Sequence, residues 1–198
     1  MSKPVIIGSF PHSGDRYFNA FLCSNFPHFI GYSANYFPFA AIIDNPEDDV
    51  LMKTQDSDPA MDFYLRSIYL VRDPLDICAE YQIETEGKEK PIHTVDRWIR
   101  HVNDWKNASY QNEVLFVKYE DTINNKEALL KNISEFFDGI EIEENDSRED
   151  ELEESVLEIG KYKNILSDED IEYITEHTES IMKELPWRED EIQLRTNG

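Results

Sequence analysis

Cysteine, glycine and positive charge are all scarce in this chain of 198 residues. It has two cysteines and seven glycines, and its 19 lysines and arginines face 42 aspartates and glutamates. Both cysteines, Cys23 and Cys78, lie in apolar helical patterns, so we expect reduced thiols in the core of a cytoplasmic protein rather than a disulfide. No cluster of cysteine and histidine has the spacing of metal ligands, so we predict no metal site.

Long hydrophobic runs are missing as well. No segment approaches the roughly 18 consecutive apolar residues that a membrane-spanning helix needs. The start of the sequence, MSKPVIIGSF, lacks the apolar stretch and the small-residue cleavage site of a secretory signal. We therefore expect a cytoplasmic protein with no membrane association, folded as a single domain over residues 1–198.

The formal net charge of −23 restricts the possible partners. Such a surface repels nucleic acids, anionic lipids and polyanionic substrates, so a small acceptor that is uncharged or cationic fits it better. An anion that binds here needs a local site of positive charge and backbone N–H groups. The oligomeric state is left open by the sequence.

The chain alternates between two kinds of pattern. Short β-branched runs predict buried strands at 4–10, 50–54, 67–71 and 114–118. Amphipathic segments predict helices at 14–26, 74–83, 92–110, 126–137 and 168–185. Two stretches are expected to be irregular: the aromatic residues 27–49 and the acidic residues 141–154, the latter solvated or partly mobile.

Alternating strands and helices predict a three-layer α/β fold, with a central parallel sheet flanked by helices. Ligands of such sheets bind at the carboxyl ends of the strands. That rule places the turn at 11–16, the strand end at Lys53–Gln55, Arg72 and Tyr119 on one rim.

The turn SFPHSGDRYF at 9–18 has the composition of an anion site. Gly14 lets the backbone approach a ligand, the N–H groups of the helix start point at it, and His12 and Arg16 add charge. The Gly-Lys-Ser/Thr sequence of Mg²⁺-nucleotide sites is absent, which counts against a kinase.

A second anion site is predicted at Arg72, which ends a strand just before a helix that Pro74 begins. The alternative is an Arg72 that pairs with Asp73 or Asp76. Two anion sites on one rim suit a ligand that carries phosphates at both ends.

These residues resemble the motifs of the sulfotransferases that use 3′-phosphoadenosine 5′-phosphosulfate (PAPS). PHSGDRY at 11–17 looks like the family's first motif, PKSGTTW. Lys53-Thr54-Gln55 looks like its KTH, and RDPLDICAEY at 72–81 looks like its RNPxDxxxSY.

Three later motifs continue the resemblance in the family's order. Residues 98–105 resemble its W…HVxxW helix, YED at 119–121 resembles a YED after a strand, and GKYKN at 160–164 resembles its GDWKN. The ordered set covers the chain from about Pro4 to Trp187 and is more specific than any single motif.

The resemblance implies a P-loop-like sulfotransferase fold and transfer of a sulfonate group from PAPS to a hydroxyl or amine, with PAP leaving. Lys53 would stabilise the charge that develops in the reaction. Arg72, with position 80, would hold the 3′-phosphate, and Tyr17 and Tyr119 would lie near the adenine. The residues implied for the 5′-phosphosulfate are those of the turn: His12, Ser13, Gly14, Asp15, Arg16 and Tyr17.

Four departures from the family pattern affect this assignment. His12 replaces the turn lysine, and Gln55 replaces the catalytic histidine, so residue 55 can orient a substrate but cannot accept its proton. Glu80 replaces the serine that binds the 3′-phosphate, and its carboxylate repels phosphate unless it turns away. Ser155-Val156-Leu157 replaces an Arg-Lys-Gly sequence, which removes two cations.

Two functions remain open from the sequence. The first is an active sulfotransferase in which Lys53, His12 and Gln55 are the candidate catalytic residues and His12, Asp56 or Asp58 replaces the missing base. The second is a non-catalytic relative that binds a nucleotide, a phosphorylated metabolite or a protein partner. The retained Lys53, Arg72 and turn favour the first. Aromatic residues of the 27–49 loop are candidates for the acceptor pocket: Tyr32, Tyr36, Phe37 and Phe39.

Overall fold

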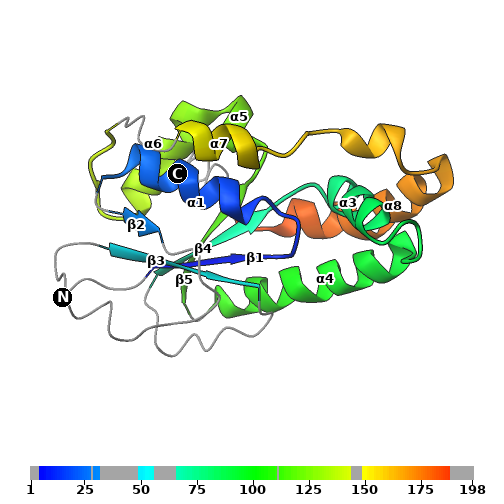
Figure 1. Ribbon diagram of the computed structural model, residues 1–198. Coiled ribbons are helices and arrows are strands. Elements are labelled where there is room, and N and C mark those ends of the chain that lie inside the picture. Colours follow the sequence, from blue (N-terminus) through cyan, green and yellow to red (C-terminus); the bar gives the residue numbers. More distant parts are fainter. Residues whose placement is uncertain are drawn as a thin grey trace.

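One parallel sheet organises the molecule. The computed structural model describes residues 5–27, 29–31, 49–55, 66–110, 112–143 and 149–187. In this part of the chain the strand order is β2-β3-β1-β4-β5, and every neighbouring pair is parallel (Figure 1). The strands are β1 (Val5–Ser9), β2 (Phe29–Gly31), β3 (Asp49–Thr54), β4 (Arg66–Val71) and β5 (Glu113–Lys118).

The four strands expected from the sequence are confirmed, and one expectation is corrected. The segment 27–49 was predicted to be irregular, but Phe29–Gly31 forms strand β2 and pairs with β3. A strand of three residues is too short to produce a recognisable alternation, so the sequence pattern missed it.

Within the described ranges, eight helical elements follow or connect the strands. They are α1 (Asp15–Asn25), α3 (Pro74–Glu84), α4 (Pro91–Ala108), α5 (Asp121–Asn124), α6 (Lys126–Phe136), α7 (Glu149–Ser155), the 3₁₀ helix η3 (Lys161–Asn164) and α8 (Asp168–Glu184). Their start signals work as predicted: the Asp73 carboxylate accepts from the Leu75 amide at 2.8 Å, and the Ser167 hydroxyl accepts from the Asp170 amide at 3.2 Å.

Helix α7 corrects a second expectation, since part of the acidic stretch 141–154 is helical. Its leucine, Leu152, packs against the core cluster that contains α1. One apolar residue among acidic ones gives no amphipathic pattern, which is why the sequence did not predict a helix here. Residues 144–148 lie outside the described part of the chain.

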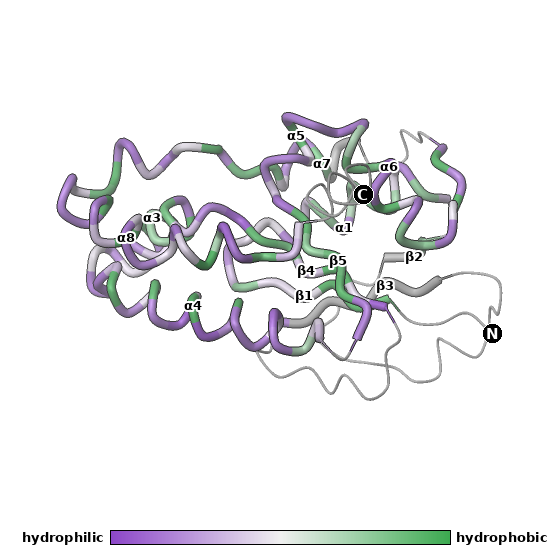
Figure 2. The backbone as a smooth tube through the Cα atoms, turned by 180° about the vertical axis from the view of Figure 1, so that it is seen from behind, coloured by the Kyte–Doolittle hydropathy of each residue, from purple (hydrophilic) through white to green (hydrophobic). Residues whose placement is uncertain are grey.

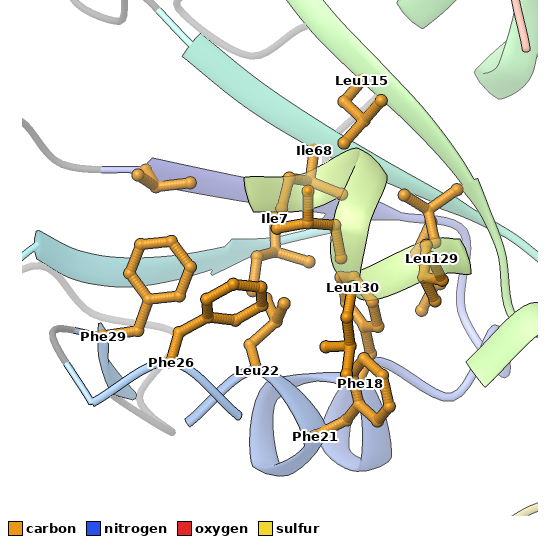
Figure 3. Packing of buried hydrophobic residues seen from close by; sticks show 14 of the residues in the cluster. Ile7, Phe18, Phe21, Leu22, Phe26, Phe29, Ile68, Leu115, Leu129 and Leu130 are labelled. Carbon is orange, nitrogen blue, oxygen red and sulfur yellow. The ribbon is translucent and has the colours of Figure 1, made fainter. Parts of the chain in front are cut away.

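Alternate strand residues face opposite layers. In Figure 3, Ile7, Ile68 and Leu115 project from the strands toward Phe18 of α1 and Leu130 of α6, and all five side chains are buried. This cluster forms the layer between the sheet and helices α1 and α6.

The opposite face of the sheet packs against α4. Trp105 stacks on Tyr69 of β4, with ring centroids 4.9 Å apart, and lies so close to β1 that a Cβ atom on Gly8 would be 2.1 Å from its ring. A third cluster joins α3, α4 and α8 through buried residues such as Cys78 and Ile174. Figure 2 shows apolar residues in β4 and β5 inside and helices that alternate between polar and apolar residues outside. The predicted three-layer α/β fold is therefore confirmed, and both cysteines are buried thiols that form no disulfide.

Candidate active site

The register of the sheet brings the predicted segments to one edge. Lys53 of β3 pairs with Ile7 of β1, and Val71 of β4 pairs with Lys118 of β5. Because all strands are parallel, the turn after β1, Gln55, Arg72 and Tyr119 follow at their carboxyl ends, as the sequence predicted. The backbone of Lys53 lies in β3, and its side chain lies outside the described part of the structure.

The turn after β1 has two residues in the left-handed backbone region. His12 has φ 65° and Gly14 has φ 85°. At Gly14 the space is closed as well, because a Cβ atom there would lie 2.4 Å from the ring of Tyr119. Gly14 precedes α1 without a side-chain cap, so the helix N-terminus faces the edge of the sheet.

Asp15 lies within this predicted anion site. Its carboxylate accepts a hydrogen bond from the Arg16 amide at 3.0 Å and another from the Gln55 side-chain amide at 3.4 Å. Asp15 therefore ties the turn to the end of β3. It also takes up one of the amides that an incoming anion would use.

Ser13 carries the clearest sign of a ligand at the turn. Its side chain is buried, and its hydroxyl has no hydrogen-bond partner among the described residues. A buried hydroxyl without a partner costs free energy unless a ligand or water satisfies it. The turn therefore fits an anion that accepts from Ser13 and from the amides at the start of α1.

Arg72 is completely buried behind the turn. Its terminal nitrogens donate to the backbone carbonyls of His12 and Glu158, each at 2.9 Å, and its guanidinium lies 5.5 Å from the centre of the Tyr119 ring. Its Nε has no partner among the described residues. The predicted alternative of an ion pair with Asp73 or Asp76 is replaced by one with Glu80, at 3.6 Å.

Glu80 lies between two cations rather than turning away. Both of its carboxylate oxygens are 3.2 Å from the Lys161 ammonium, and one is 3.6 Å from Arg72. Lys161 of the GKYKN motif thus balances the charge of a glutamate.

Tyr119 supports the turn from inside. It has no exposed surface, and its hydroxyl donates to the Leu157 carbonyl at 3.3 Å and accepts from the Leu157 amide at 2.6 Å. Burial raises the pKa of Tyr119, so the hydroxyl keeps its proton at neutral pH. Tyr17 packs edge-on against it, with centroids 5.7 Å apart. The predicted adenine contacts of these tyrosines stay predictions.

An open cleft of about 730 Å³ lies beside the turn. It is lined by residues 11, 12 and 14–16 of the turn, by Gln55, by Tyr81 and Glu84 of α3, and by residues 154, 155 and 157. The His12 ring nitrogen Nε2 is 2.9 Å from the Glu84 carboxylate. Sequence reasoning missed Glu84, although its spacing of four residues from Glu80 places both on one face of α3.

Gln55 is held from the far side of the sheet. His101 Nε2 donates to the Gln55 carbonyl at 3.1 Å, since a carbonyl can only accept. The other ring nitrogen, Nδ1, then accepts from the Tyr69 hydroxyl at 2.7 Å. His101 is thus hydrogen-bonded within the fold through both ring nitrogens.

Some predicted residues fall outside the described part of the chain, namely Asp56, Asp58, Tyr32, Tyr36, Phe37 and Phe39. Among the residues that are described, no group of three or more His, Cys, Asp or Glu side chains is arranged to hold a metal ion. No helix in this same part is long and apolar enough to cross a membrane.

Comparison with known proteins identifies the family. The sequence model of the sulfotransferase domain matches residues 2–185. Forty-three chains of solved structures match, among them mouse sulfotransferase SULT7A1 complexed with PAP, with a TM-score of 0.59, 16% identity, and coverage of 89% of this chain and 84% of that one. No curated protein sequence matches. The likeness confirms the predicted fold, and the domain match confirms the predicted enzyme class: this chain belongs to the sulfotransferase domain family.

Proposed function

We propose that this protein transfers a sulfonate group from PAPS to a hydroxyl or amine of a small acceptor and releases PAP. The observation that carries the proposal is the turn after β1. There the start of α1 has no side-chain cap and borders an open cleft, and the buried hydroxyl of Ser13 in the same turn has no hydrogen-bond partner among the described residues. The mouse sulfotransferase of the same fold was solved with PAP, which supports a nucleotide of this kind.

The reaction needs charge neutralisation more than covalent chemistry by the protein. The bond between sulfur and the 5′-phosphate oxygen breaks, a bond from the acceptor to sulfur forms, and the acceptor loses one proton. The turn amides and Ser13 would hold the 5′-phosphosulfate. Lys53, at the carboxyl end of β3, would offset the negative charge that develops on the leaving group.

Proton removal is assigned to His12 among the described residues. Gln55 cannot accept a proton, and its carbonyl and side-chain amide are engaged with His101 and Asp15. The Glu84 carboxylate at Nε2 orients the His12 ring and leaves Nδ1 to act as base. This arrangement follows the general logic of a histidine positioned by a carboxylate.

The acceptor class follows from the charges around the cleft. Asp15, Glu84 and Glu154 contribute carboxylates to its lining, against the single cation Arg16 and the ring of His12 among the described lining residues. An amine or an uncharged hydroxyl compound is therefore favoured over an anionic acceptor. Cytoplasmic localisation, proposed from the sequence, agrees with the two buried thiols that form no disulfide.

The test is direct transfer of ³⁵S-labelled sulfonate from PAPS to a panel of amines, phenols and alcohols. We expect labelled product and an equal amount of PAP. Lys53→Ala should lower kcat by about 10²-fold or more, the scale of a lost electrostatic contact in a transition state. Lys88→Ala is the matched control, because Lys88 is exposed and pairs with Glu86 away from the cleft.

Two results would overturn the assignment. Equal turnover in Lys53→Ala and Lys88→Ala would remove the role of Lys53. PAP binding by calorimetry without transfer to any acceptor class would support the non-catalytic relative instead.

A further inference from the structure

We infer that Glu80 acts as an internal anion at Arg72, so that the protein gains little affinity from the 3′-phosphate of its donor. A donor without that phosphate, adenosine 5′-phosphosulfate, should then bind almost as well as PAPS. This inference rests on the proposed function and concerns the same site. It is carried by the surroundings of Arg72.

Arg72 has little capacity left for another anion. Its two terminal nitrogens donate to backbone carbonyls at 2.9 Å, and the Glu80 carboxylate lies 3.6 Å away. The side chain has no exposed surface. A phosphate that reached the terminal nitrogens would have to displace Glu80 or the carbonyl of Glu158. The third donor, Nε, has no partner among the described residues but is buried.

Lys161 holds Glu80 in this position. Its ammonium is equidistant from both carboxylate oxygens, at 3.2 Å. The Glu80 side chain is only 15% exposed, so water screens these interactions weakly. Rotating Glu80 away would break contacts with two cations at once, which makes the carboxylate a stable occupant of the site.

Two further carboxyl groups, those of Asp73 and Glu120, lie near Arg72. Burial raises the pKa of Asp73 and of Glu120, and the charge of Arg72 opposes that rise in both. The Glu120 carboxylate also accepts from the Asp73 amide at 2.9 Å, which places the two side by side. A phosphate dianion at Arg72 would therefore meet three carboxyl groups, with Glu80 the closest to the guanidinium.

A covering segment, residues 157–162, closes the same site from outside. Leu157 is bonded to the Tyr119 hydroxyl, and Glu158 accepts from Arg72. The amides of Gly160 and Tyr162 donate to the buried Asp76 carboxylate at 2.8 and 3.1 Å. At the 5′ end of the site, the turn borders the open cleft that the described residues form.

The experiment is calorimetric titration of the full chain with PAP and with AMP, which lacks the 3′-phosphate. For the wild-type protein we expect dissociation constants within about tenfold of each other, since a phosphate that lacks charge-assisted contacts gains little. A preference for PAP of a hundredfold or more would overturn the inference and leave the proposed function intact.

Glu80→Gln removes the charge and keeps the shape. We expect it to tighten PAP binding at least tenfold while AMP binding changes less than twofold. Glu84→Gln is the matched control, because it removes a carboxylate one turn further along α3 that faces His12. Glu84→Gln should change the dissociation constants of PAP and AMP by the same factor, so that their ratio stays as in the wild-type protein.

The remaining outcomes separate this inference from the proposed function. An unchanged ratio in Glu80→Gln, with wild-type folding by circular dichroism, would overturn the role of Glu80 alone. If Glu80→Gln fails to fold, the wild-type ratio still decides the inference by itself. Absence of binding for both nucleotides at millimolar concentration, together with no sulfonate transfer, would overturn the inference and the proposed function together.

Discussion

Gly14 is the residue at which the turn tolerates the least change. Its φ of 85° disfavours any side chain, and a Cβ atom would lie 2.4 Å from the buried Tyr119 ring. We expect Gly14→Ala to lower the free energy of unfolding by about 2–4 kcal/mol, from backbone strain and overpacking together. Urea denaturation measures this loss, and calorimetry should show weaker PAP binding.

Gly139→Ala provides the control for backbone strain alone. Gly139 has a similar φ of 83°, but a Cβ atom there would have no neighbour within 4 Å. We expect Gly139→Ala to lower the free energy of unfolding by about 1 kcal/mol. Equal losses in the two variants would contradict the close contact between Gly14 and Tyr119.

Cys78 makes stability depend on pH in the alkaline range. Burial, the largest cause, raises the pKa of its thiol from 9.0 to about 12. The folded protein therefore holds a proton that the unfolded chain releases. The stability contribution is complete below pH 9 and is lost as the pH rises from 9 toward 12.

The slope of this loss can be measured. One proton corresponds to about 1.4 kcal/mol per pH unit. In urea denaturation between pH 9 and 10.5, the free energy of unfolding should therefore fall by up to that amount per pH unit because of this thiol. Cys78→Ala should show a correspondingly flatter dependence. The same slope in both proteins would mean that the thiol titrates normally in the folded state.

For single residues, the sequence predicted which side chains lie in the same site, but it did not predict which of them form ion pairs and hydrogen bonds with one another. Arg72 and Glu80 were placed in one site by their motif, and they do lie within 3.6 Å. The pairing of Glu80 with Lys161 joins residues 81 positions apart, and only the packed fold shows which of the nearby Glu and Lys side chains are partners. Likewise, the burial of Tyr119 beneath Gly14 depends on the three-dimensional turn and not on any local pattern.

Among the elements, α3 and the start of η3 are joined by the buried carboxylate of Asp76, in addition to the ion pair of Glu80 with Lys161. Asp76 has no exposed surface and accepts from the amides of Gly160 and Tyr162. Asp76→Ala leaves two donors unpaired, at about 1–3 kcal/mol each, so we expect a loss of roughly 2–5 kcal/mol in urea denaturation. Proteolytic cleavage should also become faster between residues 157 and 164.

Asp96→Ala is the control for this prediction, because Asp96 is an exposed carboxylate on α4. It should change stability by less than about 0.5 kcal/mol. If Asp76→Ala is as stable as the control, the two hydrogen bonds do not hold η3 in place.

Elements with a strong periodic pattern were predictable, and weak ones were not. Helix α4 carries Val95, Trp98, Val102 and Trp105 on one buried stripe, and its bounds agree with the prediction within two residues. Strand β2 and helix α7 have three and seven residues, and each depends on packing against longer neighbours. Their stability therefore comes from tertiary contacts that no window of sequence contains.

For the whole molecule, the net charge of −23 opposes the approach of an anionic donor. Salt screens this repulsion, since the Debye length falls from about 30 Å at 0.01 M to about 10 Å at 0.1 M ionic strength. We expect the association rate constant of PAP to rise across this range, measured by stopped-flow or surface plasmon resonance. A rate that falls with salt would show that the local positive charge of the site dominates at long range.

The overall architecture could be predicted from the sequence because the local strand and helix patterns agree with the order of elements that a parallel sheet requires. Alternating strands and helices predicted a parallel sheet, and the sheet placed the turn at 11–14, Gln55 and Arg72 at one edge. The contacts around Arg72 could not be predicted from the sequence, because the covering segment 157–162 comes from a distant part of the chain.

That covering segment has a consequence for hydrogen exchange. The amides of Leu157, Gly160 and Tyr162 are each bonded to the body of the protein by a side chain of Tyr119 or Asp76. These amides can exchange for deuterium only when the segment lifts from Arg72. We therefore expect all three to exchange at the same rate, and that rate reports how often the segment opens. Hydrogen exchange at these three neighbouring amides thus measures, in the protein without ligand, how often the buried Arg72 guanidinium becomes exposed.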